Sequence, residues 1–148
     1  PTPTPSAPDV QENVWTMSAA YNNCAAGTEL MKGLTTLFAD TKANGKYITS
    51  GENGSFSDGV ATGTALKYVA EKNGKLSVSF TGLGAKKVIY VVEENSKQTN
   101  AVASTENSSE TEKMDGKVEA DVVAGTTYYI YGAGTKACFS GAEFTPAD

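Results

Sequence analysis

The sequence predicts an all-β fold, an antiparallel β-sandwich or jelly roll, from three observations. Short runs of alternating apolar and polar residues recur along the 148-residue chain. Turns rich in glycine and asparagine separate these runs at intervals of about 8–12 residues, a spacing typical of sandwiches. The one segment with a helix-like composition, residues 26–39, contains Gly33 and the β-branched pair Thr35 and Thr36, which favour a strand there instead. A chain of this length makes one domain with a sizeable core.

Hydrophobic periodicity predicts the individual strands. Leu66, Tyr68 and Ala70 fall on one face of a predicted strand, and in residues 76–80 two serines alternate with three apolar residues. Residues 86–94 are apolar on both faces, which predicts a central strand. The full set of expected strands covers residues 33–39, 65–71, 76–80, 86–94, 117–123, 128–132 and 137–144, with a short edge strand near 101–103.

The connections between the strands carry the turn-forming residues. We expect "KNGK" at 72–75 to be a hairpin turn in which Asn73 and Gly74 adopt positive φ. Residues 49–64 are rich in glycine, serine and asparagine, and residues 95–116 are polar and low in complexity. Both stretches are therefore expected to be loops.

The first 13 residues have the composition of a linker, and residues 14–148 that of a globular module. The segment "PTPTPSAP" favours an extended polyproline conformation, and such segments join the modules of secreted proteins. Nothing at the start is typical of a signal peptide, and no apolar run reaches the roughly 18 residues that cross a membrane. We expect a secreted module, covalently linked to a catalytic domain and without membrane contact.

The charged residues argue against several classes of function. The chain has 12 lysines, no arginine and no histidine, and its 17 acidic residues give a net charge of -5. Because phosphate neutralisation drives nucleic-acid affinity, we expect no nucleic-acid partner. Without histidine the commonest general base is missing, so an enzyme would have to use lysine, tyrosine and carboxylates alone. We expect no cofactor.

Metal and disulfide chemistry depends on few residues in this chain. Cys24 and Cys138 lack the additional cysteine or histidine ligands that zinc needs. The acidic loops show no spacing typical of a calcium-binding loop, so we assign no metal ligands, and the sequence leaves open whether these loops hold a structural calcium ion. The sequence leaves open whether the two cysteines form a disulfide, nominally worth ~4–5 kcal/mol for so long a loop, or pack as separate thiols.

Four lysines in acid-free stretches are the main candidates for a binding site. They are Lys67 in residues 59–70, Lys86 and Lys87 in residues 76–92, and Lys136 in residues 122–142. Strand connectivity brings them to one end of the sandwich if the turn at 124–127 lies at the other end, beside "KNGK". Unpaired ammonium groups suit a polyanion with regularly spaced carboxylates, whereas the alternative is that these lysines only solvate the surface.

Aromatic residues offer a second mode of binding. Sugars stack their apolar C–H faces on exposed rings, and Tyr47, Tyr129 and Tyr131 are the best candidates for exposure. Tyr129 and Tyr131 lie on the face of their strand opposite to its core-like residues. The adjacent Glu93 and Glu94 are poor candidates for a catalytic pair, because neighbours on a strand point to opposite faces.

Two stretches resemble the β-sandwich modules that are appended to bacterial pectate lyases, in particular the pectin-binding family 77 carbohydrate-binding modules of cellulosomal anaerobes. They are "ALKYVAEKNGKLSVSFTGLGAKKVIYVVEE" and "VVAGTTYYIYGAGTKACF", and "VWTM" with "GLTTLFA" is similar to the opening strands of that group. The resemblance covers about residues 14–145. It implies a monomeric, non-catalytic module that binds homogalacturonan of low esterification.

The resemblance also implies which lysines contact the galacturonate carboxylates: Lys67, Lys86 or Lys87, and Lys136. Residues 49–64 depart from the related modules, many of which carry a basic residue early in this loop, and here there is none.

Three other hypotheses remain open at the level of the sequence. The module binds a neutral β-glucan or hemicellulose through its tyrosines, or it is a small polysaccharide lyase with lysine as the base, or it is a structural or adhesion domain. A panel of pectins, hemicelluloses and cellulose distinguishes the first from the pectin hypothesis, and formation of an unsaturated product identifies a lyase.

Overall fold

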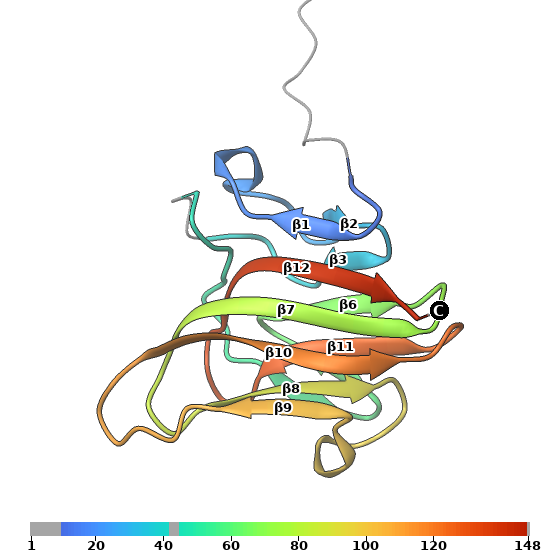
Figure 1. The fold of residues 1–148 in the computed structure, drawn as a ribbon. Helices are drawn as coiled ribbons and strands as arrows, with labels where there is room; N and C mark the ends of the chain where they lie inside the picture. The colour runs from blue at the N-terminus through green and yellow to red at the C-terminus, as the bar shows by residue number, and fades with distance from the viewer. Residues whose placement is uncertain (1–9, 42–44, 148) are drawn as a thin grey trace, which may run out of the picture.

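The computed structural model describes residues 10–41 and 45–147, and it confirms the predicted antiparallel β-sandwich (Figure 1). The strands in chain order are β1 (Val14–Thr16), β2 (Glu29–Met31), β3 (Leu34–Thr36), β4 (Ser55–Ser57), β5 (Val60–Thr62), β6 (Ala65–Val69), β7 (Gly74–Leu83), β8 (Val88–Glu93), β9 (Ala103–Glu106), β10 (Met114–Val122), β11 (Thr127–Gly132) and β12 (Cys138–Pro146). Two short 3-10 helices, η1 (Ala19–Tyr21) and η2 (Gln98–Asn100), lie between strands.

The strands form two main sheets and one separate hairpin. Sheet A has six strands in the order β2-β3-β6-β11-β8-β9, and sheet B has four in the order β1-β12-β7-β10. In Figure 1, sheet B lies in front, with β12, β7 and β10 drawn across β6 and β11. Strands β4 and β5 pair only with each other.

Alternation along each strand fills the space between the two sheets. In β7, Leu76, Val78 and Phe80 are buried, while Ser77 and Ser79 face outward, as their periodicity predicts. Sheet A packs the inward-facing aromatic and aliphatic side chains of β6 and β11 against these β7 residues. The core lies between the sheets and is continuous from one end of the sandwich to the other.

The "KNGK" turn is not the hairpin that its sequence predicts. It joins β6 in sheet A to β7 in sheet B, so the two strands lie on opposite sides of the core and do not pair. Neither Asn73 nor Gly74 is among the described residues with positive φ. Gly74 is needed for a close approach instead, since a Cβ there would lie 2.4 Å from the carbonyl oxygen of Thr145. Asn73 holds the turn through its side-chain oxygen, which accepts from the backbone N–H of Ala124 at 2.9 Å.

Strand β8 is an inner strand, as its apolar residues predict, and the structure shows what covers its second face. It lies between β11 and β9, with Ile89 and Val91 facing the core. On its outer face Val92 is also fully buried, in a second apolar cluster that includes Ala61 of β5. The stretch 49–64, expected to be a loop, therefore contains the β4–β5 hairpin that covers part of the outer face of sheet A.

The end of the expected linker, residues 10–13, is in contact with the sandwich. Gln11 and Asn13, within the expected linker, bond to the body: the carbonyl of Gln11 accepts from Lys32 N–H and that of Asn13 from Phe144 N–H. Residues 1–9 of the expected linker lie outside the described residues.

The two cysteines are free thiols, so the disulfide alternative does not hold in this structure. Burial, followed by the nearby charge of Asp40, raises the pKa of the Cys24 thiol. A raised pKa leaves less of the reactive thiolate at neutral pH, and this lowers the reactivity of Cys24.

Phe80, at the centre of the interface between the sheets, is 2% exposed. We expect Phe80→Ala to lower the free energy of unfolding by about 3–5 kcal/mol, because it removes a large buried ring and leaves a cavity. Val123→Ala is the control, since Val123 is 57% exposed and its truncation should change stability by no more than about 0.5 kcal/mol. Chemical denaturation measures both, and equal midpoints for the two variants would contradict this position of the core.

Candidate functional site

The turns gather at two ends of the sandwich, and one end carries most of the lysines predicted to bind a ligand. Strands β7 and β8 are joined there by residues 84–87, β9 and β10 by residues 107–113, and β11 and β12 by residues 133–137. The register shows that these turns are neighbours, because Gly132 pairs with Ile89 and Met114 with Leu83. We call this end the lysine end. The 124–127 turn lies at the opposite end beside "KNGK", which fulfils the condition set by the sequence.

Three of the four predicted lysines lie at the lysine end. Lys86 and Lys87 are exposed in the β7–β8 turn, and Lys136 is exposed in the β11–β12 turn. Lys67 lies instead in the middle of β6, opposite Thr35 and Tyr129 on the outer face of sheet A, and is half-buried. The structure therefore separates Lys67 from the other three by its place along the strand.

Lys86 is the member of the group with an acidic partner. It adopts a left-handed backbone conformation with φ of 64°, and its Nζ lies 3.0 Å from Oε1 of Glu110. Both side chains are more than half exposed, at 51% and 82%, so the pair contributes little to stability. Within residues 10–41 and 45–147, neither Lys87 nor Lys136 has a carboxylate within 4.0 Å.

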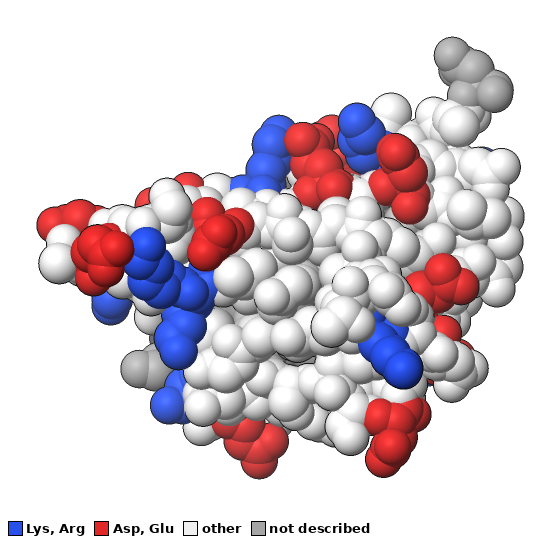
Figure 2. All heavy atoms as spheres, turned by 90° about the horizontal axis from the view of Figure 1, so that it is seen from below, with Lys and Arg blue, Asp and Glu red and all other residues white. Residues whose placement is uncertain are grey.

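The expectation that the lysine end is free of acids is wrong. The acid-rich stretch from Glu93 to Asp121 folds back through β9 and β10, so the β9–β10 loop with Glu110 lies beside the β7–β8 turn. Figure 2 shows acidic side chains next to the lysines at the left-hand end of the molecule. Sequence segments without acids do not reveal this, because the neutralising residues arrive from a distant part of the chain.

Asp115 is a second acid at this end, but it holds the backbone rather than a lysine. Its Oδ1 accepts hydrogen bonds from Oγ1 of Thr81 at 2.6 Å and from the N–H of Gly82 at 2.9 Å. These two hydrogen bonds lower the pKa of the Asp115 carboxyl. The carboxylate thereby fixes the last part of β7 before it enters the lysine-bearing turn.

Asn107 joins the two loops of the lysine end and is 2% exposed. Its side-chain nitrogen donates to the carbonyl oxygens of Leu83, Gly84 and Glu112 at 2.9, 3.1 and 2.8 Å. Its backbone adds two bonds to the β7–β8 turn, accepting from the Lys86 N–H and donating to the Lys87 carbonyl. One buried side chain therefore fixes the backbone from which both lysines project. The sequence analysis did not identify it, because a single asparagine in a polar loop gives no signal of burial.

Tyr131 is not an exposed platform, and neither is Tyr129. Tyr131 is fully buried and Tyr129 is 4% exposed, because the β4–β5 hairpin lies over them. The ring of Phe56 stacks on that of Tyr131, with centroids 5.9 Å apart and planes at 16°. The hydroxyls donate to Gln98 from Tyr131 at 2.6 Å and to Glu94 from Tyr129 at 2.9 Å.

The pKa values of these tyrosines agree with their burial. Burial raises the pKa of the Tyr129 hydroxyl to about 12, and the hydrogen bond to Glu94 adds to the effect. Burial also raises the pKa of Tyr131, with a further contribution from the charge of Tyr90. Tyr90 is half-buried on the outer face of sheet A, and Tyr47 is half-buried as well.

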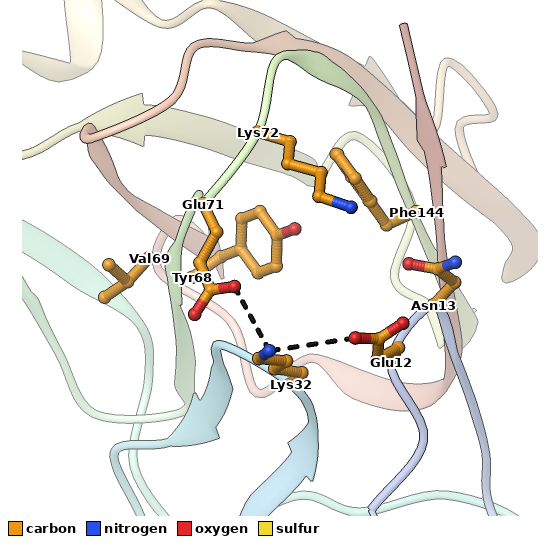
Figure 3. Close-up of a pocket in the computed structure, with 8 residues that line it drawn as sticks. All are labelled: Glu12, Asn13, Lys32, Tyr68, Val69, Glu71, Lys72 and Phe144. Carbon is orange, nitrogen blue, oxygen red and sulfur yellow. Dashed lines mark ion pairs between the residues drawn. The ribbon is translucent and has the colours of Figure 1, made fainter.

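A small hollow at the opposite end is lined by two lysines, Lys32 and Lys72 (Figure 3). Figure 3 shows the ammonium of Lys32 between Glu12 and Glu71, at 3.7 and 3.3 Å. The hydrogen bond that Lys32 donates to Glu71 is the largest cause of the raised pKa of the Lys32 ammonium. With a volume of about 30 Å³, the hollow has room for water but not for a sugar ring.

The described residues contain no group of three or more His, Cys, Asp or Glu side chains arranged to hold a metal ion. Within the same part of the chain, no helix has the length and apolar character that crossing a bilayer requires.

Comparisons with known proteins do not place the chain in a family. No protein-family model and no curated protein matches it. One similar solved structure comes from work on the complexity of the Ruminococcus flavefaciens cellulosome as an expansion in glycan recognition. It has a TM-score of 0.37 and 14% sequence identity, over 78% of this chain and 94% of that chain. A likeness at this level does not bear on what this chain binds.

Replacing Asn107 tests whether one side chain fixes the lysine end. We expect Asn107→Ala to lower the free energy of unfolding by about 2–4 kcal/mol, because three loop carbonyls lose their donor in a buried place. Amide hydrogen exchange should also rise in residues 83–87 and 107–112. Ser108→Ala, an exposed neighbour without a side-chain hydrogen bond, is the control. Unchanged exchange in both loops of Asn107→Ala would show that other contacts hold them.

Proposed function

We propose that the chain is a non-catalytic carbohydrate-binding module whose lysine end binds an acidic polysaccharide. One observation carries the proposal: Lys87 and Lys136 project from adjacent turns and have no acidic partner among the described residues. Their turns are joined to β8, since the N–H of Ala133 donates to the carbonyl of Val88 at 3.1 Å. Two free cations at a fixed backbone spacing suit successive carboxylates of a polymer.

Uronic-acid polymers fit the chemistry of this end. Lysine is a flexible point charge, so it follows the carboxylates of a repeating chain without the fixed geometry that arginine demands. Each exposed pair contributes only ~0.2–1 kcal/mol, so affinity has to come from several contacts together. Sugar hydroxyls add hydrogen bonds, and micromolar binding corresponds to about -8 kcal/mol in total. Homogalacturonan of low esterification, which carries a free carboxylate on most of its residues, is the ligand we propose.

Glu110 limits this site in the free protein. Its carboxylate occupies Lys86 at 3.0 Å, where a ligand carboxylate would otherwise bind. Lys86 therefore contributes less than Lys87 and Lys136, and Lys67 contributes only to a ligand that extends over the outer face of sheet A.

The biological setting belongs to the same proposal. A module of this kind acts outside the cell, as a monomer, and brings a covalently linked catalytic domain to its substrate in the plant cell wall. The neutral-sugar alternative loses its best support, because Tyr129 and Tyr131 are buried beneath Phe56.

Lysine substitutions test the charge mechanism. We expect the double variant Lys87→Ala with Lys136→Ala to bind polygalacturonate about 2- to 30-fold more weakly, because it removes two exposed ion pairs. Binding of the native chain should also weaken with salt and with methyl esterification of the pectin. Affinity electrophoresis in gels that contain pectins of rising ester content measures both effects.

Lys72→Ala is the matched control, because Lys72 is equally exposed but lies at the opposite end. The affinity of the Lys72→Ala variant for polygalacturonate should equal that of the native chain. Glu110→Gln should bind more tightly, because it releases Lys86 for the ligand. Equal retardation of the native chain at every ester content would refute the proposal.

A further inference from the structure

The outer faces of the two sheets differ in what covers them. Part of the outer face of sheet A lies under the β4–β5 hairpin, and its residues form a second apolar cluster. On sheet B, the outward residues of β1, β7, β10 and β12 are exposed or half-exposed in the described structure. Figure 1 looks onto this open face, with β7 at its centre.

The middle of this open face is hollowed. The register places Ser79 between Lys117 of β10 and Gly141 of β12. Two residues along β7, it places Ser77 between Glu119 and Glu143. Short side chains form the floor and long ones the walls, and the hollow has a volume of about 330 Å³. That volume is within the roughly 300–1,000 Å³ typical of small-ligand sites.

The short residues in the floor are not the ones that strand stability favours. Serine fits a strand less well than threonine or valine, and the central strand of a sheet is where good strand formers are expected. Neither serine is needed for a hydrogen bond within the fold, because neither hydroxyl has a partner among the described residues. A local choice that the fold does not require is typical of a functional position. Gly141 differs from the two serines because the fold itself favours glycine there: a Cβ would lie 3.1 Å from the Trp15 carbonyl oxygen.

The backbone also changes at the edge of the hollow. A register shift between Phe139 and Gly141 marks a bulge in β12, and Ser140 occupies it. Bulges re-aim a side chain, and they occur frequently beside binding sites. The hydroxyl of Ser140 has no partner among the described residues either, so it is available to a ligand together with the two serines of β7.

The charges around the hollow select the chemical class of ligand. Glu119 and Glu143 stand on either side of Ser77, on strands roughly 10 Å apart. Lys117 is the one cation in the lining, and it lies 4.0 Å from Glu119. Within the lining the charges of Lys117 and Glu143 cancel, and Glu119, which lies beside the lining, pairs with Lys117, so no free cation is left for a uronate. Carboxylates that accept from neighbouring sugar hydroxyls, with serine hydroxyls and an ammonium group that donate, suit an uncharged pyranose.

We propose that this hollow, over Ser77 and Ser79, is a second glycan site that binds a neutral sugar. It goes beyond the acid-binding function of the lysine end and does not depend on it, because the two sites share no residue. A module with both sites binds acidic and neutral polysaccharides at the same time, as the mixed polymers of a cell wall present them.

The double variant Ser77→Val with Ser79→Val separates the role of the floor in binding from its role in folding. Valine fills the hollow, removes both hydroxyls and favours a strand. We expect its thermal unfolding temperature to equal or exceed that of the native chain. The probes are cellohexaose, xylohexaose and mannohexaose, followed by the amide chemical shifts of β7, β10 and β12. At least one probe should shift these amides in the native chain, and its affinity should fall about tenfold or more in the variant.

Two further variants distinguish loss of neutral-sugar binding at the hollow from loss of polygalacturonate binding at the lysine end. Thr145→Val, on the same face but outside the hollow, should bind the probe as the native chain does. The Lys87→Ala, Lys136→Ala double variant should lose polygalacturonate and keep the neutral probe. The inference is overturned if none of the three probes shifts the amides of β7 in the native chain, or if filling the hollow leaves the affinity unchanged. Loss of polygalacturonate binding alone would bear only on the lysine end.

Discussion

The arrangement of this protein depends on one constraint: from β6 to β12, every connection except that between β8 and β9 crosses from one sheet to the other. Sheets in a sandwich pack about 10 Å apart, so each crossing takes a short arch over the edge of the core. The connections collect at two ends, and successive connections, that between β8 and β9 included, alternate between them. The turns that carry Lys87 and Lys136 lie side by side for this reason, although 48 residues of sequence separate the two lysines.

Crossing turns need internal support, because they do not pair as hairpins do. At the opposite end, Asn73 bonds to the backbone of the next arch. At the lysine end, Asn107 and Asp115 do the same for β7 and its turn. Each is an asparagine or aspartate that satisfies backbone groups which no strand partner can reach. The lysines thus stand on a fixed backbone, and only their side chains are left to adapt to a ligand.

The two sheets leave different surfaces to solvent. The β4–β5 hairpin turns part of the outer face of sheet A into core, so the tyrosines there serve packing. Sheet B keeps an open face of hydroxyl and carboxylate groups. The end of the sandwich offers cations, and the sheet face offers neutral and acidic hydrogen-bonding groups. Surfaces of such different character on one small domain suit ligands of different charge.

Much of this protein follows from its sequence by itself. Period-two alternation determined which residues of β7 point inward. The sequence also identified three lysines that share one end. These features depend on residues close together in the chain, where side-chain spacing and turn chemistry act directly.

Only the tertiary structure decided which strands pair. Most of the sequence predictions that proved wrong depended on strand pairing. An alternating strand buries the same face in either sheet, so "KNGK" does not reveal whether it joins partners or crosses the core. Whether Tyr131 is exposed depends on a hairpin that begins 76 residues earlier, at Ser55, and the partner of Lys86 comes from a distant loop. Pairings of this kind are long-range contacts that depend on the packing of the whole chain, and no local pattern encodes them.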